Sequence, residues 1–190
     1  MTGVAMRVLD FLGRHAALRE RLSPLRPALV RLALMQCHDR ALADDLAQEA
    51  LAKALAAASQ LRDADKLRPW LFGILMNCWR DHLRARRPSE DIDEIEESAL
   101  QADGGDGPEQ AASRRQTVQR VRAAVALLPV GQREVLALVD LESCSYAEVA
   151  QILAIPIGTV MSRLSRARAA LRVTLTEDAL VETPPLRRIK

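Results

Sequence analysis

Apolar residues recur every three or four positions in two long stretches of the chain, and a stretch without this pattern separates them. Such spacing follows the period of an amphipathic helix, about 3.6 residues. In the first stretch a helix is predicted over residues 68–87, because Pro69 suits a first turn and Pro88 follows the end. Two earlier helices are predicted from the stripes Leu25, Leu29, Leu32, Met35 and Leu42, Leu46, Ala50, Leu55.

The second stretch predicts shorter helices with well-marked ends. One helix stops before Pro129, and another follows over residues 132–141. Ser145 and Glu148 have the spacing of a capping box, which predicts a helix start there. After the short turn at residues 154–156, a last helix is predicted from Ile157. The stripe of the first of these helices is formed by Val118, Val121, Val125 and Leu128.

Residues 89–109, between the two stretches, combine many acidic residues with several glycines and contain no Lys or Arg. Such a segment cannot bury enough apolar surface to fold alone, so it is predicted to be a flexible linker. The fold class is therefore all-α, with two small helical domains joined by an acidic linker. The predicted parts are an N-terminal helical extension (1–22), a first domain (23–88), the linker (89–112), a second domain (113–175) and a C-terminal tail (176–190).

Composition agrees with packed helices, because 49% of the residues are apolar and only 3% are aromatic. The net charge of +2 does not by itself indicate a polyanion partner, so the local distribution of charge decides. No stretch resembles a signal peptide or a membrane span, and we expect a cytoplasmic protein. The cysteines, Cys37, Cys78 and Cys144, are scattered and odd in number, which predicts reduced thiols rather than a disulfide framework or a zinc site.

The last two predicted helices form a helix-turn-helix, a layout in which the second helix enters the DNA major groove. No acidic residue lies between Ile155 and Arg172, so the second helix is uniformly positive. An arginine on such a helix can pair bidentately with a guanine edge. The alternative is a basic, solvated helix with no ligand. The helix is predicted to have three faces: a packing face (Val160, Leu164, Ala167, Leu171), a base-reading face (Thr159, Ser162, Arg163, Arg166) and a flank near phosphates (Met161, Ser165, Arg168, Arg172).

Residues 128–171, "LPVGQREVLALVDLESCSYAEVAQILAIPIGTVMSRLSRARAAL", resemble region 4 of bacterial sigma factors, most closely the small extracytoplasmic-function (ECF) group of the sigma-70 family. The resemblance implies a domain that reads the minus-35 promoter element and docks on the β flap of RNA polymerase. The residues that it implies for minus-35 DNA are Thr159, Met161, Ser162, Arg163, Arg166 and Arg168.

The first domain resembles sigma region 2. "ALADDLAQEALAKAL", residues 41–55, is similar to region 2.2, which packs on the β′ clamp helices, and implies core-polymerase contacts by Asp44, Asp45, Gln48 and Glu49. Residues 69–88 are similar to regions 2.3 and 2.4, which melt and hold the minus-10 element. A surplus of basic residues over 62–87 suits that role on its own, because single-stranded DNA sites combine cations with base-holding side chains. The implied minus-10 contacts are Leu61, Arg62, Asn77, Arg80, Arg84, Arg86 and Arg87.

Three residues depart from the family pattern. Met161 stands where many members have a cation, and Leu61 stands where a stacking ring is frequent, so the promoter sequence does not follow from the resemblance. Ala154 occupies a turn position that often holds glycine, and this turn is predicted to be slightly strained if the residue is left-handed.

The predicted function is that of an alternative sigma factor, which binds core RNA polymerase and directs initiation at promoter DNA without a cofactor. An anti-sigma factor, which can hold such a protein near the membrane, is a further expected partner. The alternatives are a stand-alone helix-turn-helix regulator and a sigma mimic, but the chain shows no dimerisation helix, ligand domain or receiver domain. An enzyme is disfavoured because His15, His38 and His82 are scattered and form no catalytic or metal-binding pattern.

Overall fold

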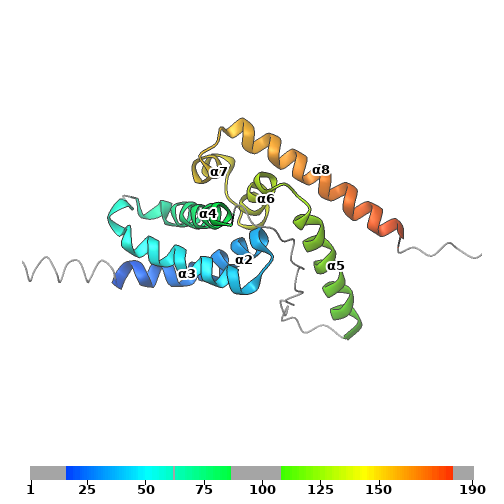
Figure 1. Cartoon of the computed structure of the whole chain (residues 1–190), viewed down its shortest axis with the longest axis horizontal. Helices are drawn as coiled ribbons and strands as arrows, with labels where there is room; N and C mark the ends of the chain where they lie inside the picture. The colour runs from blue at the N-terminus through cyan, green and yellow to red at the C-terminus, as the bar shows by residue number, and fades with distance from the viewer. Residues whose placement is uncertain (1–15, 62, 87–107, 182–190) are drawn as a thin grey trace, which may run out of the picture.

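A computed structural model of the chain describes residues 16–61, 63–86 and 108–181, apart from the side chains of 108–115 and 177–181. These residues form an N-terminal domain (16–86) and a C-terminal domain (108–181), both helical (Figure 1). After a helical segment at residues 16–22, the elements are η1 (Ser23–Leu25), α2 (Arg26–Cys37), α3 (Arg40–Ala56), η2 (Ala58–Gln60), η3 (Ala64–Lys66), α4 (Leu67–Ala85), α5 (Pro108–Ala126), α6 (Val130–Leu136), the π-helical turn η4 (Ala137–Leu141), α7 (Tyr146–Leu153) and α8 (Ile157–Val181).

The N-terminal domain is built on α2, α3 and α4, and local signals in the sequence explain where these helices begin and end. A proline lies in the first turn of α2, where the missing N–H costs nothing. The helix ends at His38, which adopts a left-handed conformation, and Asp39 then caps α3 by accepting a hydrogen bond from the Leu42 N–H at 3.1 Å. The three predicted helices of this domain are confirmed.

Small side chains let α3 approach its neighbours closely. Ala43, Ala47, Ala50 and Ala54 recur at helical spacing and are all fully buried. Alanine loses little entropy in a helix and keeps the backbones close, which leaves the larger side chains of α2 and α4 to fill the centre. The larger residues of this core are Leu29, Leu32, Leu46, Leu71, Phe72, Leu75 and Met76.

The C-terminal domain contains the predicted helix-turn-helix. The capping box at the start of α7 is complete, since the Ser145 Oγ accepts from the Glu148 N–H and the Glu148 carboxylate accepts from the Ser145 N–H at 2.7 Å. Ala154 ends the helix with φ 53° and ψ 47°, the left-handed conformation whose cost the sequence predicted for this turn. The apolar faces of α6, α7 and α8 then meet in one core.

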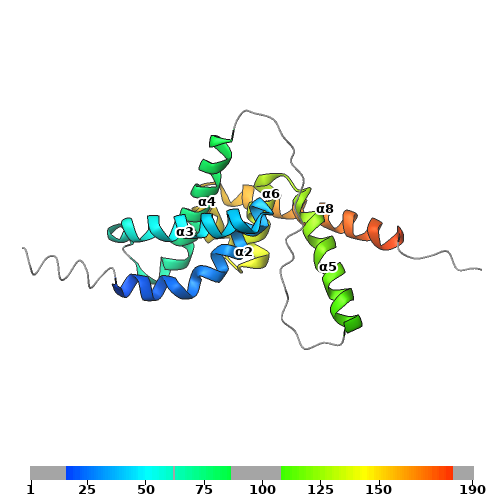
Figure 2. The same ribbon diagram turned by 60° about the horizontal axis from the view of Figure 1, so that its bottom comes forward.

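The two domains pack against each other through helices from both. The main contact joins α4 to α7, and α2 lies against α5, α6 and η4. Figure 1 shows α6 and α7 beside the N-terminal helices, and both views show α5 and the far end of α8 projecting away from them (Figures 1 and 2). Gly73 of α4 lies at this contact, where a Cβ built on it would be 4.0 Å from the Ile152 carbonyl oxygen of α7, an ordinary van der Waals distance. One continuous apolar cluster consequently extends across both domains.

Two helices of the C-terminal domain extend past the predicted domain bounds, which stay a prediction. Helix α5 begins at Pro108, inside the segment predicted as linker, because proline fits a first helical turn. Helix α8 continues to Val181, beyond the end predicted for the second domain at residue 175. No glycine or proline interrupts the sequence between residues 170 and 181, so no local signal stops the helix earlier.

Candidate nucleic-acid interface

Helices α7 and α8 are joined by the turn at residues 154–156, across which the helix direction changes by 104°. This lies in the range of helix-turn-helix units that place their second helix in the major groove. The packing face predicted for α8 is confirmed, because Val160, Leu164 and Ala167 are buried. The opposite side of the helix is left to solvent over its first three turns.

The solvent side of α8 presents a mixed polar and apolar surface. Met161 has 54% of its surface exposed, and Ser162 and Arg166 are also exposed. Thr159 is half-buried, and its carbonyl accepts a hydrogen bond from the Ser162 hydroxyl at 3.1 Å. Four of the six residues predicted for minus-35 DNA therefore lie on one accessible or partly accessible surface.

The remaining two predicted contacts, Arg163 and Arg168, are engaged within the domain. The Arg163 guanidinium lies over Gly131 of α6, where a Cβ would come within 2.8 Å of its Nη1. Arg168 donates through Nε to Asp140 at 3.1 Å, and this hydrogen bond raises the pKa of its guanidinium above the ordinary value. Both side chains would have to leave these positions before they could contact DNA.

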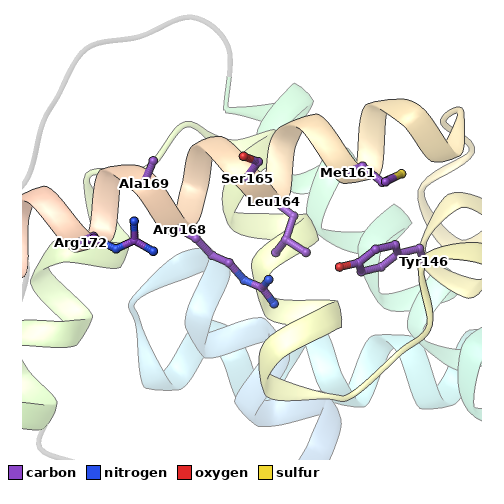
Figure 3. Close-up of a pocket in the computed structure, with 7 residues that line it drawn as sticks. All are labelled: Tyr146, Met161, Leu164, Ser165, Arg168, Ala169 and Arg172. Carbon is purple, nitrogen blue, oxygen red and sulfur yellow. The ribbon is translucent and has the colours of Figure 1, made fainter.

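A shallow cavity of about 320 Å³ lies beside the exposed surface of α8 (Figure 3). Its wall includes Tyr146 from the start of α7, whose ring points toward Leu164 and the guanidinium of Arg168. Ser165 and Met161 complete the neighbouring part of the wall. The sequence did not single out Tyr146, although the first residue after a helix cap faces the solvent in many helices and could have suggested it.

The residues predicted for polymerase binding form an exposed surface on α3. Asp45, Gln48 and Glu49 are all exposed, on the side opposite the buried alanines. The Glu49 carboxylate forms an ion pair with Lys53, one helical turn later, at an N–O distance of 2.8 Å. Asp44 is less exposed and is held between Arg26 and Arg40, each at 3.0 Å. The acidic part of this surface is thus available, with Asp44 partly neutralised.

Apart from Arg80, the residues predicted for minus-10 DNA fall into three groups. Asn77, Arg84 and Arg86 are exposed on or just after α4, and Arg84 pairs with Asp81 at 2.7 Å. Leu61 is half-buried and packs against the core. Two further residues, Arg62 and Arg87, lie outside the described residues.

Arg80 has an environment that the sequence did not predict. Its guanidinium donates two hydrogen bonds, both 3.1 Å long, to the two carboxylate oxygens of Glu134 in the other domain. The Glu134 side chain is only 5% exposed. In this conformation Arg80 is therefore occupied by a carboxylate and is not free for DNA.

A second buried carboxylate lies at the same boundary. Glu142, whose side chain is 1% exposed, accepts from Arg31 at 3.1 Å and from Arg68 at 2.7 Å. Arg68 also lies over the Phe72 ring, 5.1 Å from its centre. The sequence carried a signal for Glu134, since it stands one turn before the buried Leu138 on the apolar side of its helix, but no signal identified its partner.

The metal-ligating side chains, thiols and long helices of the described residues form no other candidate site. In the described ranges, no cluster of three His, Cys, Asp or Glu side chains could hold a metal ion. Cys37, Cys78 and Cys144 are free thiols, and burial raises the pKa of Cys144 to about 11. Among the helices that the structure describes, none alone is long and apolar enough to cross a membrane. The bent pair α7 and α8 together would be long and apolar enough, by length and composition only.

The fold and its faces define a two-domain helical protein with a helix-turn-helix, and comparison with known families gives the family. Residues 22–88 match Sigma-70 region 2, and residues 118–171 match Sigma-70, region 4. The chain belongs to the ECF sigma factors of the sigma-70 family, whose members are transcription initiation factors.

Relatives and solved structures agree with this assignment. The ECF RNA polymerase sigma factor EcfG of Rhodopseudomonas palustris is 34% identical over 170 residues, which cover 89% of this chain and 91% of that protein. RNA polymerase sigma-H factor of Pseudomonas aeruginosa is 36% identical over 142 residues, covering 70% and 73%.

Two solved structures share the arrangement of helices. The sigma factor RpoE in complex with the anti-sigma factor NepR from Bartonella quintana has a TM-score of 0.66 at 27% identity, covering 84% of this chain and 97% of that one. CnrH in complex with the cytosolic domain of CnrY has a TM-score of 0.64 at 26% identity, covering 90% and 95%.

Proposed function

We propose that this sigma factor binds core RNA polymerase through the exposed polar surface of α3 and reads promoter DNA with α4 and α8. The observation that carries the proposal is the division of α8 into a buried apolar face and an exposed face with Ser162 and Arg166. A helix that served only to pack against the core would have no reason to exclude every acidic residue from residues 157–176, where several positions face solvent. That composition suits a polyanion.

The proposed division of labour follows the domains. In the N-terminal domain, Asp45, Gln48 and Glu49 are exposed together and fit a polar surface on the β′ clamp helices. Asn77, near the middle of α4, is exposed and would hold an unpaired base of the minus-10 element, with cations on the same helix near the phosphates. In the C-terminal domain, Arg166 would read a base edge of the minus-35 element.

We further propose that an anti-sigma factor controls the chain. This rests on the RpoE structure described above, which holds the anti-sigma factor NepR and matches 84% of this chain. The CnrH structure, which matches 90% of this chain, likewise holds a protein partner, CnrY. The partner would compete for the exposed surfaces of α3 and α8.

The test for polymerase binding is Asp45→Arg in the full chain, with binding to core polymerase measured by fluorescence anisotropy. Asp45 is exposed, so the variant should keep its circular dichroism spectrum and lose at least about tenfold in affinity, as expected for a like charge placed at an interface. The matched control is Glu20→Arg, which makes the same charge change at another exposed position of this domain. Equal affinities for the two variants would argue against α3 as the polymerase surface.

A stand-alone regulator is the alternative function. Such a regulator would bind duplex DNA tightly without polymerase. Asp45→Arg would leave its effect on transcription unchanged. The exposed surface of α3 favours the sigma function, because a regulator that acts alone has no use for it.

A further inference from the structure

Two carboxylates of the C-terminal domain are buried against arginines of the N-terminal domain. Glu134 takes both hydrogen bonds from Arg80, and Glu142 takes one from Arg31 and one from Arg68. These partners are separated by 54 to 111 positions in the sequence, so the contacts exist only while the domains are together. A buried ionised carboxylate that loses its partner is strongly unfavourable. Removing the charge from one member of a pair should therefore destabilise the packed arrangement of the domains.

The arginines concerned belong to the surface that would contact DNA. Arg68 and Arg80 lie on α4, in the basic stretch predicted for the minus-10 element. A carboxylate meets a guanidinium through two oxygens as a phosphate does, with the same bidentate geometry. Glu134 therefore presents to Arg80 the chemistry that a DNA phosphate would present.

We propose that the described arrangement is a closed, self-inhibited state in which Glu134 and Glu142 occupy the arginines that DNA phosphates take when the domains separate. This inference rests on the proposed function, because it assigns Arg80 and Arg68 to DNA. It adds a competition within the chain: in the closed state the carboxylates occupy the same cations that DNA would bind, so closure and DNA binding exclude each other.

The boundary between the domains also contains features that limit the stability of the closed state. Gln36, at the C-terminal end of α2, is 1% exposed, and neither its side-chain nitrogen nor its oxygen has a hydrogen-bond partner in the described structure. Its carbonyl accepts from Arg133 of α6 at 2.7 Å, so Gln36 lies at the contact between the domains. Opening would hydrate the buried amide, which offsets part of the loss of the ion pairs. The closed state is thus favoured and still releasable.

The native cysteines report the opening without added probes. Cys144 is 6% exposed, contacts the Glu142 carbonyl and lies close enough to Arg68 for that cation to lower its thiol pKa in part. Cys78 is buried within the N-terminal domain, and the groups that act on its pKa, including Lys53 and Glu49, belong to the same domain. Domain separation should therefore expose Cys144 and leave Cys78 protected.

The first experiment measures thiol labelling of the full chain, with peptide mass mapping to separate Cys144 from Cys78. Glu134→Gln and Glu142→Gln keep the shape of each side chain and remove the charge. Each should raise the labelling rate of Cys144 by about tenfold or more. The rate is proportional to the fraction of open molecules, and breaking a buried ion pair destabilises the closed state several-fold more than breaking a surface pair. Glu20→Gln, an exposed charge removal, should change neither rate.

Two further variants separate charge from general damage. Exchanging the charges in Arg80→Glu with Glu134→Arg should restore protection of Cys144 relative to Glu134→Arg alone, which no loss of folding would do. Gly73→Phe forces α7 away from α4 while both carboxylates remain, and it should open the chain, whereas Gly73→Ala should not, since its Cβ fits at 4.0 Å.

The second experiment measures binding of a mixed-sequence single-stranded DNA to the free chain. Glu134→Gln should bind several-fold more tightly than wild type, and adding Arg80→Ala should remove the gain. Unchanged Cys144 labelling in both Gln variants, with native circular dichroism spectra, would overturn the proposal. Faster labelling without any gain in DNA affinity would overturn it too, because the arginines would then not be shared. Neither readout needs polymerase, so a failure of the proposed function shows separately, as absent initiation.

Discussion

Arg133 is a half-buried cation that contacts both domains, and the cost of removing it can be worked from its hydrogen bonds. Its guanidinium donates to the carbonyls of Gln36, Ala126 and Leu128 at 2.7 to 3.0 Å, and one nitrogen lies 2.9 Å from His38 Nε2. Replacing it by methionine keeps the apolar stem and leaves three carbonyls without this donor. At about 1 kcal/mol net for each hydrogen bond, Arg133→Met should lower the free energy of unfolding by about 3 kcal/mol.

The assay is urea unfolding followed by circular dichroism, with the slope m compared between variants so that the change is in stability and not in compactness. The control is Arg19→Met, an exposed arginine, which should stay within about 0.5 kcal/mol of wild type. A loss below about 1 kcal/mol for Arg133→Met, with an unchanged slope, would refute the stabilising role of these three hydrogen bonds.

Three other predictions concern pH, DNA and helix capping. Burial, and to a smaller extent Arg133, lowers the pKa of His38 in the folded chain. As pH falls below the ordinary value of 6.5, the unfolded chain takes up the proton before the folded one, so the free energy of unfolding should decrease. His38→Asn should flatten this pH dependence in unfolding measurements, and the same dependence in the variant and the wild type would exclude His38 as its source. Arg166→Ala should weaken initiation by about tenfold at promoters whose minus-35 element matches, and less at promoters with another base at the contacted position. Arg172→Ala should lower DNA affinity equally for all sequences and reduce the slope of log affinity against log salt by about one. The same dependence on DNA sequence in both variants would contradict the assignment. Ser145→Ala should cost about 1 kcal/mol of stability in urea unfolding by removing the cap of α7, and no loss would show that the cap does not contribute.

Local patterns were sufficient for the helix-turn-helix. The Ser145 cap, the left-handed turn at Ala154 and the packing face of α8 each depend on residues within a few positions of one another. Periodicity and capping rules act over that range, and for this reason the predicted all-α fold and these elements are confirmed. The exposed residues of α3 come instead from the resemblance to sigma region 2.2, and their role stays a prediction.

The boundary between the domains could not be predicted in this way. Glu134 and Arg80 are separated by 54 positions, and no local rule relates an acid in one helix to a cation in another. From the sequence, Arg80 and Arg168 were therefore predicted to be cations available to DNA. In the structure each is paired with a carboxylate, Arg80 with Glu134 and Arg168 with Asp140. Arg163 is a similar case, because its position over Gly131 depends on how α6 packs against α8.

The most direct test of the whole account is transcription of the source organism's sheared genomic DNA by its core polymerase, with and without the chain, followed by mapping of the RNA 5′ ends. The account predicts new start sites that appear only with the chain, share sequence elements near minus-35 and minus-10, and disappear with Asp45→Arg. Start sites that are identical with and without the chain would contradict it.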